Sequence, residues 1–359
     1  MERTVAMNHT RLQSDMALSV LDTAPVVEGS TAREALRNAV DLASLADSLG
    51  YRRYWVAEHH GMKGVASCAT SVIISEVAGA TTRIRVGSGG ILLPNHPPIL
   101  IAEQFGTLEI FHPGRIDLGV GRAPGGSKKV VERVRPEVDR NAKSLTEQIE
   151  ELLQYFSPPQ PGGINVVPAV GNVPEIWMLG SGSESAALAG SLGLRYAFAA
   201  HLNPDAAVDA VHKYRSRFTA ARDGHAPYVV LAVPVIAAET DSRAEWLAGS
   251  IRLKILSRRL GKRIRLPSPV DAAAYPYSDD ERGRLAELTP GYVIGGPETI
   301  REGLQAVIDK TNANELIVTS PIFDHVARRQ SYQILAGVGS RLRLEHSNSQ
   351  QARSSTAAG

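Results

Sequence analysis

Short apolar stretches alternate with longer amphipathic stretches along most of this chain. The short stretches have the length of β-strands, and the longer ones repeat their apolar residues with the period of an α-helix. Eight segments are predicted as strands, namely residues 17–21, 52–58, 83–90, 115–121, 175–180, 194–199, 228–238 and 315–320. Helices are predicted over about 31–49, 67–80, 97–111 and 139–155, from Glu184 onward, over 204–221 and after the last strand.

The first helix has sequence signals at both ends. Thr31 fits an N-cap and Glu34, three residues later, completes a capping box, while Gly50 ends the helix. Strands that alternate with helices favour parallel pairing through right-handed crossovers, and eight strands is the number that closes a barrel. The pattern therefore predicts an α/β protein with a (β/α)8 TIM barrel. An open, doubly wound sheet is the alternative.

Two segments interrupt the alternation of strands and helices. Residues 123–174 follow the fourth strand and include the turn-rich SPPQPGGINVVP, whereas residues 250–288 follow the region of the seventh strand after a short helix. The second segment is basic at first and then rich in Pro, Tyr and Asp. Both follow carboxyl ends of strands, so we expect them to cover a site there. We also expect residues 250–288 to order as a lid when ligands bind.

The bulk properties fit one soluble domain. We expect a flexible arm over residues 1–15, a single barrel domain over 16–340 and a disordered tail over 341–359. A formal charge of +2 with scattered basic residues argues against nucleic acid or a membrane as a partner, and no run of 18 apolar residues is present. The single cysteine, Cys68, excludes an intramolecular disulfide, fits the reducing cytoplasm and is expected to be buried.

The fourth predicted strand delivers an arginine at its carboxyl end. Gly119 and Gly121 remove side-chain bulk from a backbone that we expect a neighbour to approach closely, and Arg122 offers permanently charged donors that suit a phosphate. The alternative is an arginine paired with a neighbouring carboxylate.

A Gly/Ser turn lies at the carboxyl end of the fifth strand. Gly180, Ser181, Gly182 and Ser183 open a helix whose free backbone N–H groups could bind an anion, and together with Arg122 they would hold one phosphate. The alternative is an ordinary helix cap. The segment matches neither G-x-G-x-x-G nor a Walker loop, so a Rossmann or nucleotide-triphosphatase function has no support here.

Glu58, His59 and His60 follow the second strand. The functional interpretation is a titratable imidazole at the mouth of the site. The structural alternative is that one histidine caps a loop or pairs with Glu58. Adjacent histidines point in different directions and the sequence marks no third ligand, so no metal site is predicted.

Three motifs, AEHHGM, RIRVGSGGILLPNHPPILIAEQFGTLE and HPGRIDLGVGRAPG, occur in this order. Together they resemble the bacterial-luciferase-like flavin-dependent monooxygenases, and the resemblance covers about residues 16–340. It implies a barrel, usually dimeric, that binds reduced FMN (FMNH2) supplied by a separate NAD(P)H:flavin reductase and activates O2 as a flavin C4a-(hydro)peroxide. The chain looks most like the single-chain luciferase-like oxidoreductases, some of which tailor antibiotics and other secondary metabolites.

The resemblance also implies roles for individual residues. His59 matches the catalytic histidine and Arg122 the arginine on the FMN phosphate, while Ser181 and its neighbours Gly180, Gly182 and Ser183 match the remaining phosphate contacts. Gly89 and Gly90 match a pair joined by a cis peptide bond under the flavin ring.

Two positions depart from the luciferases themselves. Gly121 stands where they have a reactive cysteine, and Gly180 where they have a glutamate beside the phosphate. Aldehyde-dependent light emission is therefore not transferred to this chain.

The substrate implied is a small, largely apolar metabolite that is hydroxylated or epoxidised, for example an aromatic polyketide-like compound. Residues 20–23, Trp55, Ile91 and Trp177 would offer apolar surfaces near the flavin, although core packing explains the same residues. A related subgroup uses the deazaflavin F420. The alternatives are therefore an F420-dependent hydride-transfer oxidoreductase and a non-catalytic flavin-binding protein.

Overall fold

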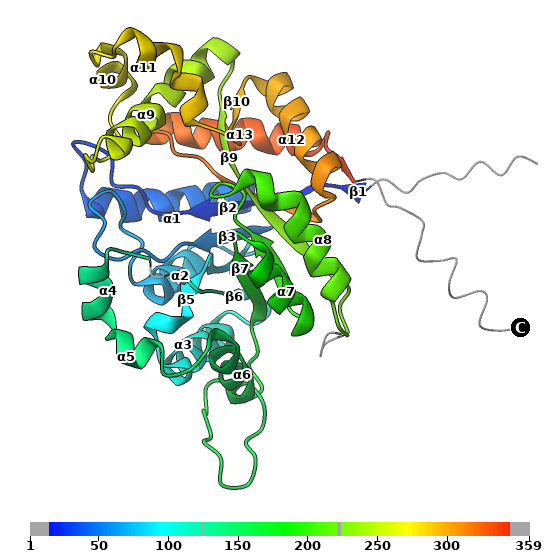
Figure 1. Cartoon of the computed structure of the whole chain (residues 1–359). Coiled ribbons are helices and arrows are strands. Elements are labelled where there is room, and N and C mark those ends of the chain that lie inside the picture. The colour runs from blue at the N-terminus through cyan, green and yellow to red at the C-terminus, as the bar shows by residue number, and fades with distance from the viewer. Residues whose placement is uncertain (1–13, 124, 221–223, 345–359) are drawn as a thin grey trace, which may run out of the picture.

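Eight parallel strands form a closed barrel in the computed structural model, which describes residues 14–123, 125–220 and 224–344 (Figure 1). In barrel order they are β2 (Ala17–Asp22), β3 (Arg53–Val56), β4 (Arg85–Ser88), β6 (Ile116–Gly121), β7 (Glu175–Gly180), β8 (Arg195–Phe198), β9 (Val229–Ala237) and β11 (Glu315–Thr319). The barrel closes because β8 pairs with β9, β9 with β11, and β11 with β2. All eight predicted strands are confirmed, and closure excludes the open-sheet alternative.

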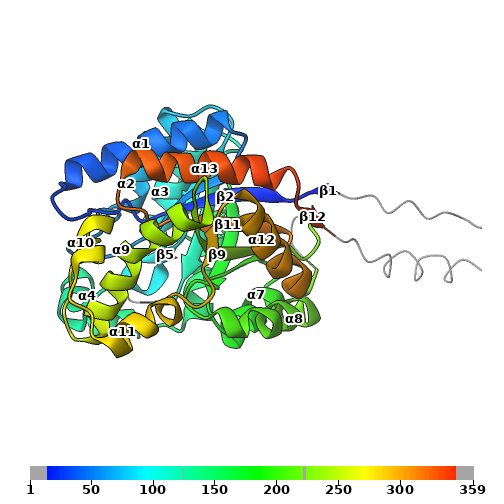
Figure 2. The same cartoon turned by 90° about the horizontal axis from the view of Figure 1, so that it is seen from above.

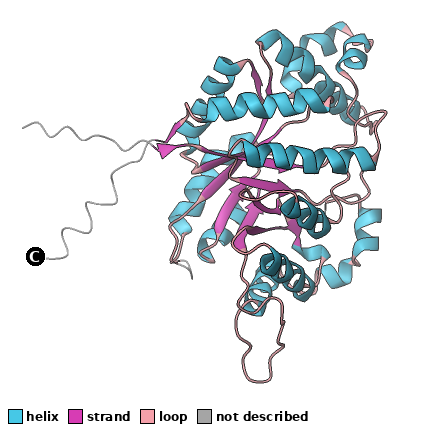
Figure 3. Cartoon of the chain, turned by 180° about the vertical axis from the view of Figure 1, so that it is seen from behind, coloured by secondary structure: helices cyan, strands magenta, loops and turns pink. Residues whose placement is uncertain are grey.

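Helices surround the barrel on the outside (Figures 2 and 3). They are α1 (Ala32–Ser48), α2 (Thr70–Gly79), α3 (Pro98–Phe111), α7 (Ser183–Ser191), α8 (Ala207–Arg217), α9 (Asp241–Arg259), α12 (Pro297–Thr311) and α13 (His325–Gly339). The capping box at the start of α1 is confirmed, since Thr31 accepts from the backbone N–H of Glu34 and Glu34 accepts from that of Thr31. Helix α12 lies in a segment for which no helix was predicted.

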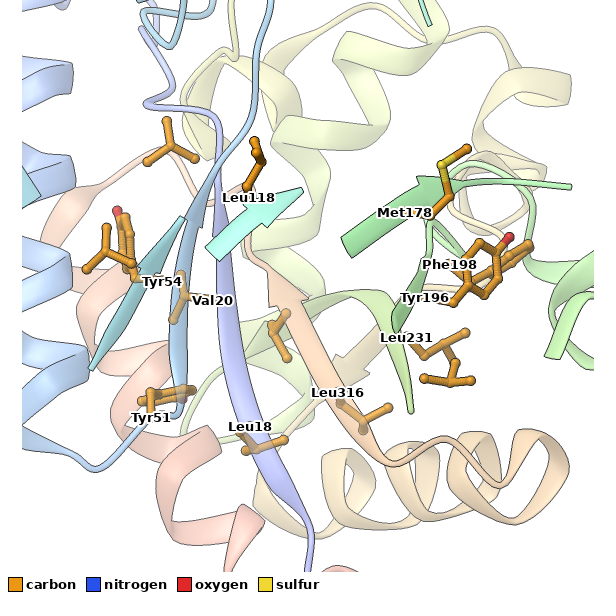
Figure 4. Packing of buried hydrophobic residues seen from close by; sticks show 14 of the residues in the cluster. Leu18, Val20, Tyr51, Tyr54, Leu118, Met178, Tyr196, Phe198, Leu231 and Leu316 are labelled. Carbon is orange, nitrogen blue, oxygen red and sulfur yellow. The ribbon is translucent and has the colours of Figure 1, made fainter. Parts of the chain in front are cut away.

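The core has two layers because successive strand side chains point to opposite faces. Leu18, Val20, Tyr54, Leu118 and Leu231 belong to the cluster between the strands and the outer helices (Figure 4). A smaller cluster inside the barrel contains Leu21, Trp55, Ala57, Trp177, Ala197, Val230, Ala232 and Ile317. The rings of Trp55 and Trp177 meet edge to face there, with centroids 5.3 Å apart.

An ion-pair network closes the amino end of the barrel. Arg53, at the start of β3, donates from Nη1 to Asp117 Oδ2 and Glu175 Oε1, both at 2.9 Å, and from Nε to Glu315 Oε1 at 3.1 Å. Burial alone would lower the pKa of Arg53, but the carboxylates of Asp117, Glu315 and Glu175 outweigh it and raise that pKa. The residues at this end therefore stabilise the barrel. In barrels of this kind the active site lies at the opposite end, where the strands have their carboxyl ends.

The described ends of the domain lie slightly outside the predicted boundaries at 16 and 340. A short antiparallel pair joins β1 (Ser14–Asp15) to β12 (Arg343–Leu344). Most of the predicted arm and tail, residues 1–13 and 345–359, lies outside the described residues. The division into arm, domain and tail therefore stays a prediction.

The first insertion carries α4 (Lys128–Val134), α5 (Glu137–Arg140) and α6 (Leu145–Tyr155). The predicted helix over 139–155 is therefore two helices, and α4 was not predicted. A Cβ added to Gly61 would lie 2.6 Å from Cγ2 of Val130, and the N–H of His60 donates to the carbonyl of Gly125 at 2.9 Å. The insertion thus packs on the loop that follows β3.

The second insertion begins inside a helix, because α9 is 19 residues long and not the short helix that was expected. It continues through α10 (Pro269–Ala274), α11 (Asp279–Gly283) and a 3-10 turn (Leu285–Leu288) to β10 (Val293–Gly295), which pairs with β9. Arg265 donates to the carbonyls of Lys63 at 3.2 Å and Ser30 at 3.0 Å. These bonds join the segment to the loops after β2 and β3; its behaviour as a lid remains a prediction.

Figures 1 and 2 both show α4, α9 and α10 at the end of the barrel away from β1, which is the carboxyl end of the strands. Both insertions therefore cover the expected end. Within the described part of the chain, no helix combines the length and the apolar character needed to cross a membrane. Cys68 is exposed in the loop before α2, so the expectation of a buried thiol is wrong.

Candidate active site

Two histidines stand on opposite sides of the barrel mouth. His59 follows β3 and His201 follows β8, and these strands are four places apart in the ring of eight. In each ring the Nδ1 atom is buried and has no hydrogen-bond partner among the described residues. The sequence singled out His59 but missed His201, because only closure of the barrel brings the two strand ends to one site.

Burial keeps both imidazoles uncharged. Burial lowers the pKa of His59; the charges of His60 and Lys254 lower it further, and only the Glu58 carboxylate opposes them. Burial lowers the pKa of His201 to about 4, and the neighbouring His59 adds to that effect. At neutral pH each ring can therefore offer a neutral nitrogen as a hydrogen-bonding group or as an acceptor of a proton.

Glu58 anchors two further histidines. Its Oε1 lies 2.7 Å from Nε2 of His60 and 2.8 Å from Nε2 of His96, and its Oε2 accepts from the N–H of Leu92 at 3.0 Å. Burial would raise the pKa of Glu58, but these partners, His96 foremost, outweigh it and lower that pKa. The alternative that one histidine pairs with Glu58 is thus confirmed for His60.

His96 is also the third ligand-type residue that the sequence analysis did not recognise. The ligand atoms of Glu58, His60 and His96 lie within 4.8 Å of one another, as in a metal site. The distances of 2.7 and 2.8 Å to the Glu58 oxygen are those of hydrogen bonds, which already account for the cluster. Hydrogen bonds to Glu58 therefore hold this cluster together beside the His59 loop.

Close packing against residues of other strands explains three of the glycines. The Gly89–Gly90 peptide bond is cis, as the resemblance implied. A Cβ on Gly89 would lie 2.5 Å from Cδ1 of Leu21, and one on Gly90 would lie 2.7 Å from the carbonyl oxygen of Gly119. At Gly119 the approaching group is the carbonyl of Ser88, 2.2 Å from an added Cβ, whereas at Gly121 the nearest atom is 3.9 Å away. Close approach is therefore confirmed at Gly119 and not at Gly121.

Arg122 is exposed and pairs with a carboxylate. Its Nη1 lies 3.2 Å from Oε2 of Glu184, and the two side chains are 72% and 82% exposed. The structure thus contains the ion pair that was the alternative to phosphate binding. Such an exposed pair contributes about 1 kcal/mol or less, so a doubly charged anion can displace the glutamate.

The Gly/Ser turn leads from β7 into α7. Gly182 is the N-cap of α7, and no side chain of the described residues caps it, so the amides of the first turn are available to an anion. A Cβ on Gly180 would lie 1.9 Å from Oγ of Ser185, which donates to the carbonyl of Gly182 at 2.8 Å. This hydroxyl occupies the space that a side chain at position 180 would need.

The predicted apolar surfaces belong to the core. Val20, Trp55, Ile91 and Trp177 are each at most 2% exposed. Nε1 of Trp55 donates to Oδ2 of the buried Asp117 at 2.8 Å, which ties that ring to the amino-end network. The structure therefore bears out the core-packing explanation for these four residues.

Lys254, on α9, was not recognised from the sequence because it lies within a helix and not at a strand end. Its Nζ is 3.7 Å from the position that a Cβ on Gly64 would take, in the loop that also carries His59. Burial and the charge of Arg258 both lower the pKa of Lys254. The side chain makes no hydrogen bond or ion pair with another residue that the structure describes.

The fold and these residues define a (β/α)8 barrel with uncharged histidines and an uncapped helix start at the carboxyl side of the strands. The chain belongs to the luciferase-like monooxygenase family, whose model matches residues 16–314. It is 41% identical to a luciferase-like monooxygenase of Escherichia coli (strain K12) over 90% of this chain and 97% of that protein. It is 32% identical to the N-acetyl-S-alkylcysteine monooxygenase of Bacillus subtilis (strain 168), over 89% of this chain and 97% of that protein.

Solved structures have the same fold. The structure of apo-MsnO8 superposes with a TM-score of 0.84 at 38% identity, covering 90% of this chain and 98% of that chain. Two more distant structures show the fold alone. One is the oxygenating constituent of 3,6-diketocamphane monooxygenase in complex with FMN, at 19% identity and a TM-score of 0.71. The other is an F420-dependent secondary alcohol dehydrogenase, at 13% identity and a TM-score of 0.64.

Proposed function

We propose that this protein is the oxygenating component of a two-component flavin-dependent monooxygenase, which uses FMNH2 and O2 to hydroxylate or epoxidise a largely apolar metabolite. The observation that carries the proposal is the pair of uncharged imidazoles, His59 and His201, each with a buried and unpartnered Nδ1, at the carboxyl end of a barrel of this family. Active sites of such barrels lie at that end.

The residues present fit FMN. The uncapped first turn of α7 at Ser183, with Ser181 and Gly182 before it, would offer backbone N–H donors to the phosphate. Arg122 would offer its guanidinium, whose partner among the described residues is the exposed Glu184. Gly89 and Gly90 present backbone without side chains beside the site of the ring. When bound, reduced flavin supplies the electrons for the activation of O2.

The chain's own residues would position the reactants, exclude water and move a proton at Nδ1 of His59. Nδ1 of His59 is buried without a partner, so it can accept a proton from a reacting oxygen and return it later. Nδ1 of His201 can fix the orientation of a polar group on the opposite side. The insertions at α4 and α9 cover the loop that carries His59 and limit the access of water.

We further propose that the protein acts in the cytoplasm, as a homodimer, with an NAD(P)H:flavin reductase as its partner. Family membership supports the reductase and the flavin. The Bacillus relative named for N-acetyl-S-alkylcysteine adds thioethers to the substrates worth testing. A tailoring role in antibiotic biosynthesis belongs to the same proposal.

Turnover under 18O2 tests this function. The protein would be incubated with FMN, NADH and a flavin reductase and offered long-chain aldehydes, alkanes, polycyclic aromatics and N-acetyl-S-benzylcysteine. We expect one atom of 18O in the product of at least one class. Hydride exchange with reduced F420 and no oxygen incorporation would favour the F420-dependent alternative. Tight flavin binding without any turnover would favour the non-catalytic one.

A further inference from the structure

The start of the second insertion is strongly basic. Seven of the fourteen residues from 252 to 265 are Lys or Arg, and no Asp or Glu occurs between Glu245 and Asp271. Figures 1 and 2 place this segment, at the end of α9, on the carboxyl side of the barrel. A local excess of positive charge beside the site attracts anions from solution.

Two cationic side chains of α9, those of Arg252 and Lys254, differ in the partners that surround them. The buried guanidinium of Arg252 is paired with Glu245 and donates to Oγ1 of Thr289 at 3.4 Å. Lys254 is partly buried as well, yet none of the described residues offers it a carboxylate or a hydrogen bond. The charge that lowers its pKa, in addition to burial, is the like charge of Arg258, one turn further along the helix.

An unpaired, partly buried ammonium is costly, since a charge removed from water needs a compensating partner. Like charges four residues apart on a helix add to this cost. The Nζ atom lies beside Gly64, and its charge influences His59, so the missing partner would sit next to the proposed reaction centre. An anionic ligand group would supply that partner.

The phosphate of FMN is not that group. Helix α9 packs, through Leu247, Ile251 and their neighbours, against Val27 after β2, Ile236 in β9 and Ile322 after β11. Arg122 and α7 follow β6 and β7, which lie on the opposite side of the ring of strands from β2 and β11. Lys254 and the phosphate site thus belong to two separate anions.

We propose that Lys254 binds a carboxylate of the substrate, so that the substrate is an apolar body with one anionic end. This inference rests on the proposed function, because the substrate meant here is the molecule that the monooxygenase would oxidise. The body lies toward His59 and His201, and the carboxylate lies at α9, where Arg258 and the basic residues after it increase the local concentration of anions. The inferred substrate class is therefore narrower than that of apolar metabolites in general, because its members also carry a carboxylate.

Binding of matched acids and esters tests the proposal without turnover. Equilibrium dialysis of the full-length protein with decanoate, 2-naphthoate and their methyl esters would be carried out with and without FMN. We expect at least one acid to bind the wild-type protein about 10-fold more tightly than its ester. Lys254→Met should remove that preference and Lys254→Arg should largely keep it. Lys262→Met, which removes an exposed charge from the same segment, should change it less than about 2-fold.

Three outcomes would overturn the proposal. Equal affinity of acids and esters for the wild-type protein would do so even if a variant failed to fold. An equal loss of the preference for acids in Lys254→Met and Lys262→Met would indicate that the positive charge of the whole segment attracts acids, without a specific site at Lys254. A Lys254→Met variant that binds FMN more weakly but riboflavin normally would assign Lys254 to the flavin phosphate. Retained acid binding together with no 18O incorporation would instead refute the proposed function and leave the anion site standing.

Discussion

His59 and His201 show how single residues acquire chemistry from the fold. Each follows a strand that ends in the protein interior, so desolvation, with no carboxylate partner strong enough to reverse it, lowers the pKa of both imidazoles. Glu58, in contrast, holds the rings of His60 and His96 by hydrogen bonds. The loop after β3 thus carries one constrained histidine and one unpartnered histidine.

The pKa of His201 predicts a dependence of stability on pH. Its folded value of about 4 lies below the ordinary value of about 6.5, so between these pH values the unfolded chain binds a proton that the folded chain does not. Stability supplied by this residue is therefore lost as the pH falls from about 6.5 to about 4. His201→Gln should lose less unfolding free energy over that range, as measured by urea unfolding at several pH values. The exposed His212→Gln is the control, and equal slopes in His201→Gln and the wild type would contradict the argument.

Arg122 carries the prediction for cofactor affinity. Arg122→Ala should weaken FMN binding by about 1.5 to 3 kcal/mol, since a charged hydrogen bond to the phosphate is lost. Glu184→Gln removes the carboxylate that competes with phosphate for the guanidinium, so it should leave affinity unchanged or raise it. A fluorescence titration with FMN measures both, and riboflavin, which lacks the phosphate, should show no effect of Arg122→Ala. Unchanged FMN affinity in Arg122→Ala would remove this residue from the phosphate site.

Among the elements, strand β3 connects the two ends of the barrel. Its first residue, Arg53, lies in the ion-pair network of the amino end, and the loop after its last residue carries Glu58 and His59. Alternation along the strand points Tyr54 toward the helices and Trp55 into the barrel. One short strand therefore joins the ion-pair network to the loop that we propose to be catalytic.

Substitution of Arg53 tests the importance of the network. Arg53→Met removes the buried cation that Asp117 and Glu315 share and leaves them only the more exposed Arg85 and Arg52, and breaking a buried pair in this way costs about 3 to 5 kcal/mol. Arg52→Met is the matched control, because Arg52 is half exposed and lies 3.6 Å from Glu315. Chemical denaturation should give a clearly lower free energy of unfolding for Arg53→Met than for Arg52→Met. If Arg53→Met were as stable as Arg52→Met, the network would not be a determinant of stability.

At the scale of the whole molecule, local patterns could predict the eight strands because each is a short apolar run bounded by turns or helix caps. Helix α12, which was not predicted, carries an equally regular pattern in its buried Ile300, Leu304 and Ile308. The residues that meet His59 at the barrel mouth had no such local signal in the sequence. His201 and Lys254 reach His59 only through closure of the barrel and the return of α9, and His96 reaches the same loop through the pairing of β3 with β4. No spacing along the chain reveals these contacts.

The phosphate site remains a prediction from β6 and β7, and it could be made because a glycine-flanked arginine and a Gly/Ser turn before a helix are local features of the sequence. The pairing of Arg122 with Glu184 was anticipated only as an alternative, because the spacing of 62 residues says nothing about contact. The substrate site was the least predictable part, since apolar residues such as Trp55 and Trp177 proved to be core.

The most direct test of the central claim is the incorporation of 18O from O2 by wild-type protein and His59→Ala, each supplied with FMN, NADH and a flavin reductase. We predict labelled product from the wild type. In His59→Ala we predict a large loss of labelled product together with nearly unchanged FMN affinity, because the imidazole moves a proton and does not hold the phosphate. Equal labelling by both proteins, or a loss explained entirely by weaker FMN binding, would contradict the role of His59. The absence of label from every wild-type product would contradict the monooxygenase itself.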